Sequence, residues 1–494
     1  MIELIPAQLR LAASVGFGAR FRVKSLERIL AAMIATRAEF GSMGEDAEQM
    51  IQGPLFSADT ELRRDVERRR FRQQAVRAAR ETCYYRELFE RIGLDPRRLE
   101  WEDIQMVPLT TKADLRERPD DFTRERGRPT LRALTTGTTS APTAVHYSEH
   151  ELAAVSAMGA INFVSSGQVS AEDIVQVSIS SRAPVGLQTF GRACGRVGAA
   201  VHGAGLIDPS HGLALLAEQR SIPGKKRQVS ILSTHPSYLG ELVERGIAEG
   251  YGRSDFGLER IFVSGEIATA GLLSRARRLF GDVEFTETWS STEIFPHGGV
   301  VCTAGHMHFA PATGLTEIRS LSGDGIARPG EPGTIVATPF PPFREATIVL
   351  RFETGDVVRQ LDSTPTCELP NVQATTPIQG KLATSIEHAH GWTFQRDVAE
   401  ALEHCDAVPL PARYAFGRSG DGVAVDVVVR GDRHATERQL RDHLEGNRVP
   451  LTSLHLLDDP RSIRRAASLR CDLKETVFAP TVGRSPRAQG RRVA

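Results

Sequence analysis

The chain has 494 residues, and 61 basic residues balance 61 acidic ones, so its formal net charge is zero. A chain of this length exceeds one ordinary hydrophobic core, so we expect two or three domains. Its apolar content of 40% and charged content of 25% are typical of a globular protein. Neither this charge balance nor any apolar run indicates nucleic-acid binding or a membrane span, so we expect neither partner.

The first stretch, MIELIPAQLRLAASVGFGARFRV, has arginines throughout and no uninterrupted apolar core, so we expect no signal peptide. The cysteines are widely scattered, which favours reduced thiols and a cytoplasmic protein. Arginine supplies nearly all of the positive charge. Any mechanism that needs a lysine must use one of a short list: Lys24, Lys112, Lys225, Lys226, Lys381 and Lys474.

Two helical patterns precede the first motif. Residues 60–93 carry apolar residues at helical spacing among many charges, which predicts one long helix whose arginines form a solvated face. The segment PLTTKADLRERPDDF, residues 108–122, predicts a loop followed by a short helix with Thr111 as its N-cap.

Strand-like and helix-like segments alternate in the middle of the chain. Helices are expected at 237–250 and 270–281. Apolar runs predict strands at 173–180, 260–266, 282–289, 333–340 and 345–356. This alternation predicts an α/β fold, a large multi-layer domain.

A turn-rich stretch, residues 359–377, marks the expected domain border. Beyond it we expect helices at 392–405 and 434–447, a hairpin within 412–431 and a strand at 451–459, which make a smaller α+β domain. We therefore divide the chain into a large domain, 1–378, a small mobile domain, 379–482, and a basic tail, 483–494, which we expect to be disordered.

The most unusual short stretch is a run of small hydroxyl residues around one glycine: Thr135, Thr136, Gly137, Thr138 and Thr139. Successive backbone N–H groups in a glycine-containing turn form a concave anion site, and threonine hydroxyls add donors. This pattern predicts a phosphate-binding loop. An ordinary turn rich in Ser and Thr is the alternative.

Two later motifs each follow a predicted strand, where α/β sheets place their ligands. The first is Trp289, Ser290, Ser291, Thr292 and Glu293, which could stack a base and hold a metal; the alternative is a capped strand end. The second ends at Asp356, whose carboxylate could accept both hydroxyls of a ribose. A plain turn is the alternative there.

The order of these motifs resembles the adenylate-forming superfamily of acyl-CoA synthetases, adenylation domains and luciferases, and most closely the phenylacetate–CoA ligases. The resemblance covers roughly residues 80–360, and it is poor over the last hundred residues. It is carried by YYRELFERIGLDPRRLEWEDIQMVPLTTKADLRE, TTGTTSAPTAVHYSEHEL, STHPSYLGELVERG, RIFVSGEIATAGLLSRARRLFG, TWSSTEIF and RFETGDVVR.

The resemblance implies ATP and Mg²⁺ as cofactors and assigns a role to each motif. Residues Thr135 to Thr139 would wrap the phosphates, with Thr138 at the reacting centre. Ser264, Gly265 and Glu266 would line the adenine. Residues Trp289 to Thr292 would pack on adenine and contact the α-phosphate. Glu293 would hold Mg²⁺, Asp356 would bind the ribose, and Lys381 would keep a cationic contact to it.

The implied reaction is attack of a carboxylate on the α-phosphate, giving an acyl adenylate and pyrophosphate. The acyl group of a small acid, with an aromatic one favoured, would then pass to CoA. Transfer to an amine or a carrier protein is an alternative, as is activation of nitrite for diazotisation of an arylamine in secondary metabolism. A nucleotide-binding protein without catalysis is a further alternative. The sequence leaves the oligomeric state open, including a homodimer.

Three departures from the family pattern bear on this assignment. The loop continues with Ser140 and Ala141 where the family has Gly-Lys, so its lysine is missing. The hinge reads Gly380-Lys381-Leu382-Ala383-Thr384, without the acidic residues of the family hinge. The C-terminal catalytic lysine is replaced by Ala467 or Ser468. Lys474 could take over its role, although a surface position is the reading that we favour.

Two further sets of residues are candidates. His235, Ser237, Tyr238 and Phe295 stand where the family forms its acyl pocket, with ordinary packing as the alternative. Cys302, His306, His308 and Cys367 could supply four donors to zinc. Their irregular spacing, without a paired Cys-x-Cys, instead favours unbound residues. A serine hydrolase is not expected, because there is no Gly-x-Ser-x-Gly elbow.

Overall fold

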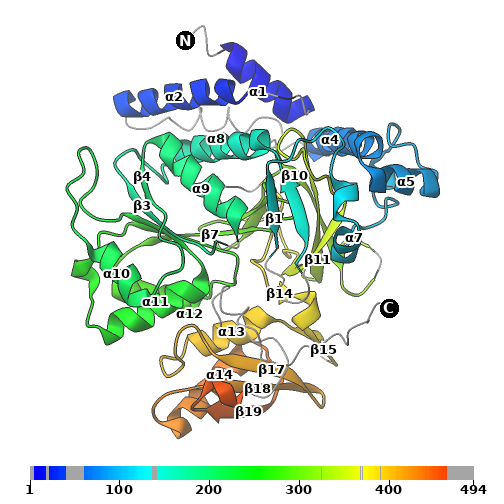
Figure 1. The fold of residues 1–494 in the computed structure, drawn as a ribbon. Helices are drawn as coiled ribbons and strands as arrows, with labels where there is room; N and C mark the ends of the chain where they lie inside the picture. Colours follow the sequence, from blue (N-terminus) through cyan, green and yellow to red (C-terminus); the bar gives the residue numbers. More distant parts are fainter. Residues whose placement is uncertain are drawn as a thin grey trace, which may run out of the picture.

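The structure is a computed structural model, and it describes residues 5–17, 20, 22–40, 60–135, 142–181, 183–323, 325–367, 369, 371–389 and 391–463. Three regions discussed above lie outside these residues: the tail expected at 483–494, Lys474, and residues 136–141 of the hydroxyl loop. None of the described helices is both long and apolar enough to cross a membrane. The described chain forms a large α/β domain and a smaller α+β domain below it in the view of Figure 1, which confirms the predicted fold class.

An eight-stranded sheet forms the centre of the large domain. From one edge to the other, its strands are β13 (Ala374–Thr375), β9 (Met307–Phe309), β8 (Gly298–Val301), β7 (Glu284–Ser290), β6 (Arg260–Ser264), β5 (Ile231–Thr234), β3 (Ile174–Ser178) and β4 (Ala200–His202). Strands β4, β3, β5, β6 and β7 are parallel, and β8, β9 and β13 continue the sheet in antiparallel fashion. The carboxyl ends of the parallel strands therefore share one edge.

Helices cover both faces of this sheet (Figure 1). Helices α8 (Glu149–Ser166) and α9 (Pro184–Val197) pack on one face, and the N-terminal α1 (Ile5–Phe17) and α2 (Val23–Phe40) extend the same apolar cluster. Helices α10 (Pro209–Ala217), α11 (Pro236–Ala248) and α12 (Ala270–Phe280) pack on the other face. Parallel strands buried on both faces explain why their sequences are apolar runs.

A second sheet lies beside the first. It is antiparallel in the order β10 (Gly314–Ser320), β11 (Pro332–Pro339), β12 (Phe352–Arg359) and β14 (Gly380–Lys381). Helices α4 (Thr60–Glu81) and α5 (Cys83–Ile92) share its apolar core. The short helices α6 (Trp101–Ile104), α7 (Lys112–Glu117) and η2 (Pro119–Phe122) lead to a hairpin of β1 (Leu131–Leu134) and β2 (Ala144–Tyr147).

The expected single helix over 60–93 is wrong, because the chain breaks between α4 and α5. Thr82 adopts an extended conformation, with φ −129° and ψ 144°, and its hydroxyl donates to the Ala78 carbonyl. The expectation that the arginines of this helix are all solvated is also wrong. Arg70 is fully buried and donates to the Ala312 and Pro341 carbonyls at 2.6 Å each. Burial lowers its pKa to about 9.

The predicted strand over 345–356 is correct only in its second half. Ile348, Val349 and Leu350 are fully buried, but they form no regular strand, and β12 begins at Phe352. Arg351 has a φ of 45°, a left-handed conformation that turns the chain before the strand starts. Its guanidinium pairs with Glu317 at 2.9 Å, which holds this turn. The apolar run therefore reflects burial of these side chains, and not their pairing in a strand.

The small domain contains the predicted helices and strands: α13 (Gln395–Glu403), β17 (Tyr414–Ser419), β18 (Gly422–Val428), α14 (Arg433–Gly446) and β19 (Leu451–Leu457). Strands β15 (Ile386–His388) and β16 (Gly391–Thr393) were not predicted, and β16 occupies the start of the helix expected at 392–405. Strands β17 and β18 form the predicted hairpin, with Ser419 opposite Gly422, and β19 joins β18 in parallel. Short 3₁₀ turns η3 (Arg253–Asp255), η4 (Leu382–Thr384) and η5 (Pro460–Ser462) complete the described elements.

The small domain docks on α11 and α12 of the large domain. Arg275 of α12 donates to the Val408 carbonyl at 2.7 Å and pairs with Glu244 of α11 at 2.5 Å. Arg396 of α13 pairs with Glu287 of β7 at 3.0 Å and donates to the Ala268 carbonyl at 2.9 Å. The interface therefore combines these polar contacts with an apolar one, since Leu410 packs in the cluster of α11 and α12.

Candidate functional site

Glu293 lies in a turn directly after β7, at the carboxyl edge of the central sheet. The turn is closed by the amides of Ile294 and Phe295, which donate to the Ser291 carbonyl at 3.1 and 2.9 Å. The Glu293 side chain is only 3% exposed, and its carboxylate lies 4.0 Å from the ammonium of Lys112. A buried carboxylate with one cation at this distance is suited to hold a metal ion.

Asp356 and Lys381 form the second charged pair of the site. They lie opposite each other where β12 pairs with β14, and their side chains meet at 2.6 Å. Asp356 is 8% exposed, and Gly355, with a φ of 72°, bends the strand just before it. Because Lys381 ends the large domain's second sheet, the chain crosses to the small domain after it, close to the border expected at 378/379.

Lys112 is a residue to which the sequence assigned no role. It starts α7, where the hydroxyl of Thr111 accepts from the Asp114 amide, so the predicted cap is confirmed. Helix α7 packs against β12, which brings Lys112 toward Asp356 and Lys381 as well as Glu293. Burial, and next the charge of Lys381, lower the pKa of Lys112.

The base of the hydroxyl loop is described, although residues 136–141 are not. The Thr135 amide donates to the Thr143 carbonyl, and the Thr143 amide donates to the Thr135 hydroxyl, both at 2.9 Å. These bonds close a narrow loop between β1 and β2. The Tyr147 hydroxyl, at the end of β2 away from the loop, donates to the Thr292 carbonyl and so links the hairpin to the turn that holds Glu293. The roles expected of Thr136, Gly137, Thr138 and Thr139 fall outside the described residues.

The residues before Glu293 present both apolar and polar groups. Trp289 is half-buried and makes an edge contact with Phe309, with ring centroids 6.0 Å apart. The Ser290 hydroxyl donates to the His297 carbonyl at 2.7 Å, so it stabilises the turn. The Ser291 hydroxyl is buried and has no hydrogen-bond partner among the described residues. A buried hydroxyl beside Glu293 that the described chain leaves unsatisfied is consistent with a polar ligand at this position.

The Ser264–Glu266 turn follows β6 at the same sheet edge. Gly265 is exposed, with a φ of 83°, and Glu266 accepts from the Ser237 amide at 2.8 Å. The ring of His235 lies between its neighbours: its Nε2 accepts from the Ser180 amide at 3.3 Å, and its Nδ1 lies 2.9 Å from the Ser264 carbonyl. This pattern assigns the ring proton to Nδ1. The His235 ring then connects the ends of neighbouring strands through two hydrogen bonds to backbone groups.

The four expected acyl-pocket residues do not lie in one environment. Tyr238 is fully buried in the cluster between the sheet and α10–α12, and Ser237 is 3% exposed. Phe295 is partly exposed and packs beside the cluster of β1, β2, α8 and α9. The structure therefore brings Phe295, rather than Tyr238, close to the turn that carries Glu293.

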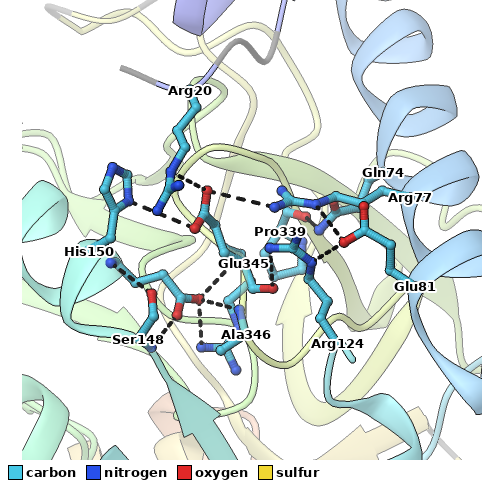
Figure 2. A network of polar contacts seen from close by, with 12 residues as sticks. Arg20, Gln74, Arg77, Glu81, Arg124, Ser148, His150, Pro339, Glu345 and Ala346 are labelled. Atoms are coloured by element: carbon cyan, nitrogen blue, oxygen red, sulfur yellow. Dashed lines mark hydrogen bonds and ion pairs between the residues drawn. The ribbon is translucent and has the colours of Figure 1, made fainter. Parts of the chain in front are cut away.

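A buried polar network surrounds Glu345, close to the chain that leads into β12 (Figure 2). Glu151 of α8 accepts from the amides of Glu345 and Ala346 at 2.6 and 3.0 Å, and it lies 3.7 Å from the fully buried Arg344. Side chains from three separate segments lie close to the Glu345 carboxylate. The closest is Arg20 at 3.4 Å, and the others are Arg77 and His150. The network anchors the segment that runs into β12 and Asp356.

A second cluster has the composition of a metal centre. Candidate donor atoms of Cys302, His306, His308 and Cys367 lie within 4.8 Å of one another. Their irregular spacing in the sequence favoured unbound residues, but strand pairing brings the four residues together. His308 of β9 lies opposite Ala374 of β13, and this pairing places the loop that carries Cys367 beside β9. The Nε2 of His308 lies 3.3 Å from the Cys367 sulfur, and its Nδ1 lies 3.4 Å from the Val372 carbonyl.

This geometry fits a tetrahedral zinc ion. Zinc bonds of about 2.0–2.3 Å place neighbouring donors about 3.3–3.8 Å apart, so a small contraction of the cluster is enough. The Nδ1 of His306 is buried without a hydrogen-bond partner, as expected for a group prepared to meet an ion. A carbonyl that holds the second nitrogen of a histidine, as Val372 can for His308, is a common feature of zinc sites.

We expect the purified protein to contain about one zinc ion per chain, because four N and S donors suffice for a closed site. Elemental analysis after dialysis measures it. Cys367→Ser should lose the metal and lower the unfolding temperature, whereas Cys83→Ser, which changes a partly exposed thiol on α5, should change neither. Metal-free wild-type protein whose unfolding temperature is unaffected by added zinc would refute the site.

Comparisons with known proteins were made at three levels. No family model matches the sequence, and no curated protein matches it. The structure is similar to 2-hydroxyisobutyryl-CoA ligase in the postadenylation state with 2-HIB-AMP, with a TM-score of 0.70, 19% identity, and coverage of 86% of this chain and 92% of the ligase. An anthranilate CoA ligase bound to anthranoyl-AMP gives a TM-score of 0.50 and 13% identity, over 68% of this chain and 64% of that one.

The chain thus has the fold of adenylate-forming acyl-CoA ligases. An open conformation of 2-hydroxyisobutyryl-CoA ligase with 2-HIB-AMP and CoA gives a TM-score of 0.59 at 20% identity, over 83% of this chain and 91% of the ligase.

Proposed function

We propose that this protein is an ATP- and Mg²⁺-dependent ligase of the phenylacetate–CoA ligase type, which adenylates a small carboxylic acid and transfers the acyl group to CoA. One observation carries the proposal. Glu293 and the Asp356–Lys381 pair come from separate segments of an acyl-CoA ligase fold and both lie near Lys112, and the hairpin that carries the hydroxyl loop is joined to the turn of Glu293 through Tyr147.

Each of these groups has a task in adenylation. Asp356 would accept the ribose hydroxyls, and the ammonium of Lys381, 2.6 Å away, would orient its carboxylate. Glu293 is suited to hold Mg²⁺, since it is a buried carboxylate beside an unsatisfied hydroxyl. When bound, Mg²⁺ neutralises phosphate charge. The chain itself positions substrate and ATP for in-line attack, which is most of what this reaction requires.

The substrate that we propose is a small aromatic acid. Phe295 is the partly exposed aromatic residue next to Glu293, and half-buried Trp289 lies at the start of the same turn. A flat ring in contact with them would be favoured by edge-to-face or stacked packing. The solved neighbours support the class of reaction more than the identity of the acid. The ligands in their structures include 2-HIB-AMP, CoA and anthranoyl-AMP.

Pyrophosphate release on mixing the protein with Mg²⁺·ATP and a panel of aryl acids tests the proposal. We expect release with at least one acid and, when CoA is added, formation of a thioester. Release that needs an amine, a carrier protein or nitrite in place of CoA or the acid would select one of the alternative acceptors. ATP binding without release under any condition would make the chain a non-catalytic nucleotide-binding protein.

A further inference from the structure

The backbone on both sides of Glu293 is fixed to the hairpin of β1 and β2. On the side before it, the Tyr147 hydroxyl donates to the Thr292 carbonyl. This carbonyl belongs to the same planar peptide unit as the Glu293 amide, so the bond sets the direction in which the chain enters Glu293. On the side after it, Phe295 packs against the apolar cluster that contains the Tyr147 ring. Glu293 therefore lies between two points that depend on Tyr147 and its surroundings.

The ring of Tyr147 is itself held in place by a buried cation. The guanidinium carbon of Arg344 lies over the ring, 4.0 Å from its centroid. Arg344 is fully buried, and a guanidinium nitrogen lies 3.7 Å from the Glu151 carboxylate. Its nitrogen atoms make no hydrogen bond within the described chain, so the ring and the charge of Glu151 are what offset its burial. The ring is therefore held in one orientation, with its hydroxyl directed at the turn.

The Tyr147 hydroxyl keeps its proton and gives it to the backbone. Burial raises the pKa of this phenol, and the positive charge of Arg344 opposes the shift only in part. The charge of Glu293 also raises the pKa, which indicates that the two side chains are close. A neutral phenol has one proton to donate, and here the Thr292 carbonyl accepts it. The phenol thus leaves the carboxylate oxygens of Glu293 available to a ligand.

We propose that Tyr147 is a positioning residue for the metal site, because it holds the peptide unit that enters Glu293 and so orients the carboxylate toward Mg²⁺. This inference rests on the proposed function, since it assumes that Glu293 holds the metal of Mg²⁺·ATP. Tyr147 is buried, so it acts through Glu293 and does not touch the nucleotide. Magnesium demands near-ideal ligand geometry, and groups that orient a metal ligand typically contribute about 10–100-fold to metal affinity.

The test measures by calorimetry the affinity of α,β-methylene-ATP, whose α–β bridge cannot be cleaved, in Mg²⁺ and in EDTA. Tyr147→Phe should weaken binding in Mg²⁺ by about tenfold, because the orientation of the metal ligand is lost. Binding in EDTA should change by less than about twofold, because no metal is present. Adding Tyr147→Phe to Glu293→Gln should cause no further loss in Mg²⁺, since the two residues act as one unit. A merely structural role of Tyr147 would instead weaken binding in EDTA as well, and also in the Glu293→Gln background.

Ser230→Ala is the matched control for the loss of a buried hydrogen bond. The Ser230 hydroxyl is fully buried and donates to Asp173 at 2.8 Å, directly before β5 and so at the amino end of the parallel strands. This variant should lower the unfolding temperature about as much as Tyr147→Phe, because each loses one buried hydrogen bond, and leave both affinities unchanged.

Two results would contradict the inference in different ways. If the wild type binds the analogue more tightly in Mg²⁺ than in EDTA, and Tyr147→Phe binds it as the wild type does, the inference is overturned and the proposed function stands. If the wild type binds the analogue equally in both conditions, or in neither, the proposed Mg²⁺-dependent function is overturned, and the inference with it.

Discussion

Glu293→Gln is expected to lower acid-dependent pyrophosphate release by on the order of 10²–10³-fold, the usual effect of losing one preorganised charge-stabilising group. The substitution keeps the shape of the side chain and removes its charge. Glu293 is buried beside the Ser291 hydroxyl, which has no partner among the described residues. It is also the one carboxylate in this described turn, so no neighbour in the turn can replace it. A neutral amide is a poor magnesium ligand, so turnover should fall more than nucleotide affinity.

The matched control for this prediction lies on the same strand. Glu284 starts β7 at the opposite end of the sheet, and its side chain is 71% exposed, so Glu284→Gln should leave pyrophosphate release unchanged. Thermal unfolding of both variants checks that the fold is intact. Wild-type rates in Glu293→Gln would mean that the metal is held elsewhere, and would remove the main support for magnesium at this turn.

The sequence predicted most elements of the fold because each kind of element has its own spacing of apolar residues. Parallel strands appear as apolar runs, the hairpin of β17 and β18 as strict alternation around a turn, and α7 as a capped helix. It failed where burial and local structure disagree. Thr82 breaks a helix that periodicity continues, and Arg70 is buried where a charged residue was expected at the surface.

The candidate site was predictable only in part. Motif order pointed to Glu293 and Asp356, which both lie near Lys112 in the structure. Lys112 was missed because its proximity to Glu293 depends on the bridge between Thr110 and Phe352, which joins segments far apart in sequence. The scarcity of lysines was the available signal. The Cys and His cluster was named as a candidate from the sequence, but its spacing favoured unbound residues, because the proximity of its members depends on pairing of β9 with β13.

The docking of the small domain depends on two glycines without space for a side chain. A Cβ atom added to Gly271 of α12 would meet the carbonyl carbon and oxygen of Glu403 at 2.4 Å. One added to Gly240 of α11 would meet the Pro411 nitrogen at 2.9 Å. These contacts are between backbones, so no side-chain rotation relieves them. Glycine at these positions thus allows the close approach that the polar interface around Arg275 requires.

Gly271→Ala is therefore expected to weaken docking of the small domain by about 1–3 kcal/mol, the usual cost of overpacking, while both domains stay folded. Hydrogen exchange should increase at α13 and at the start of α12, and the radius of gyration in solution scattering should rise. Gly195→Ala on α9 is the control: it is also a helical glycine, but an added Cβ meets nothing within 4 Å, so docking should not change. Unchanged exchange in Gly271→Ala would mean that the two domains do not spend most of their time docked in solution.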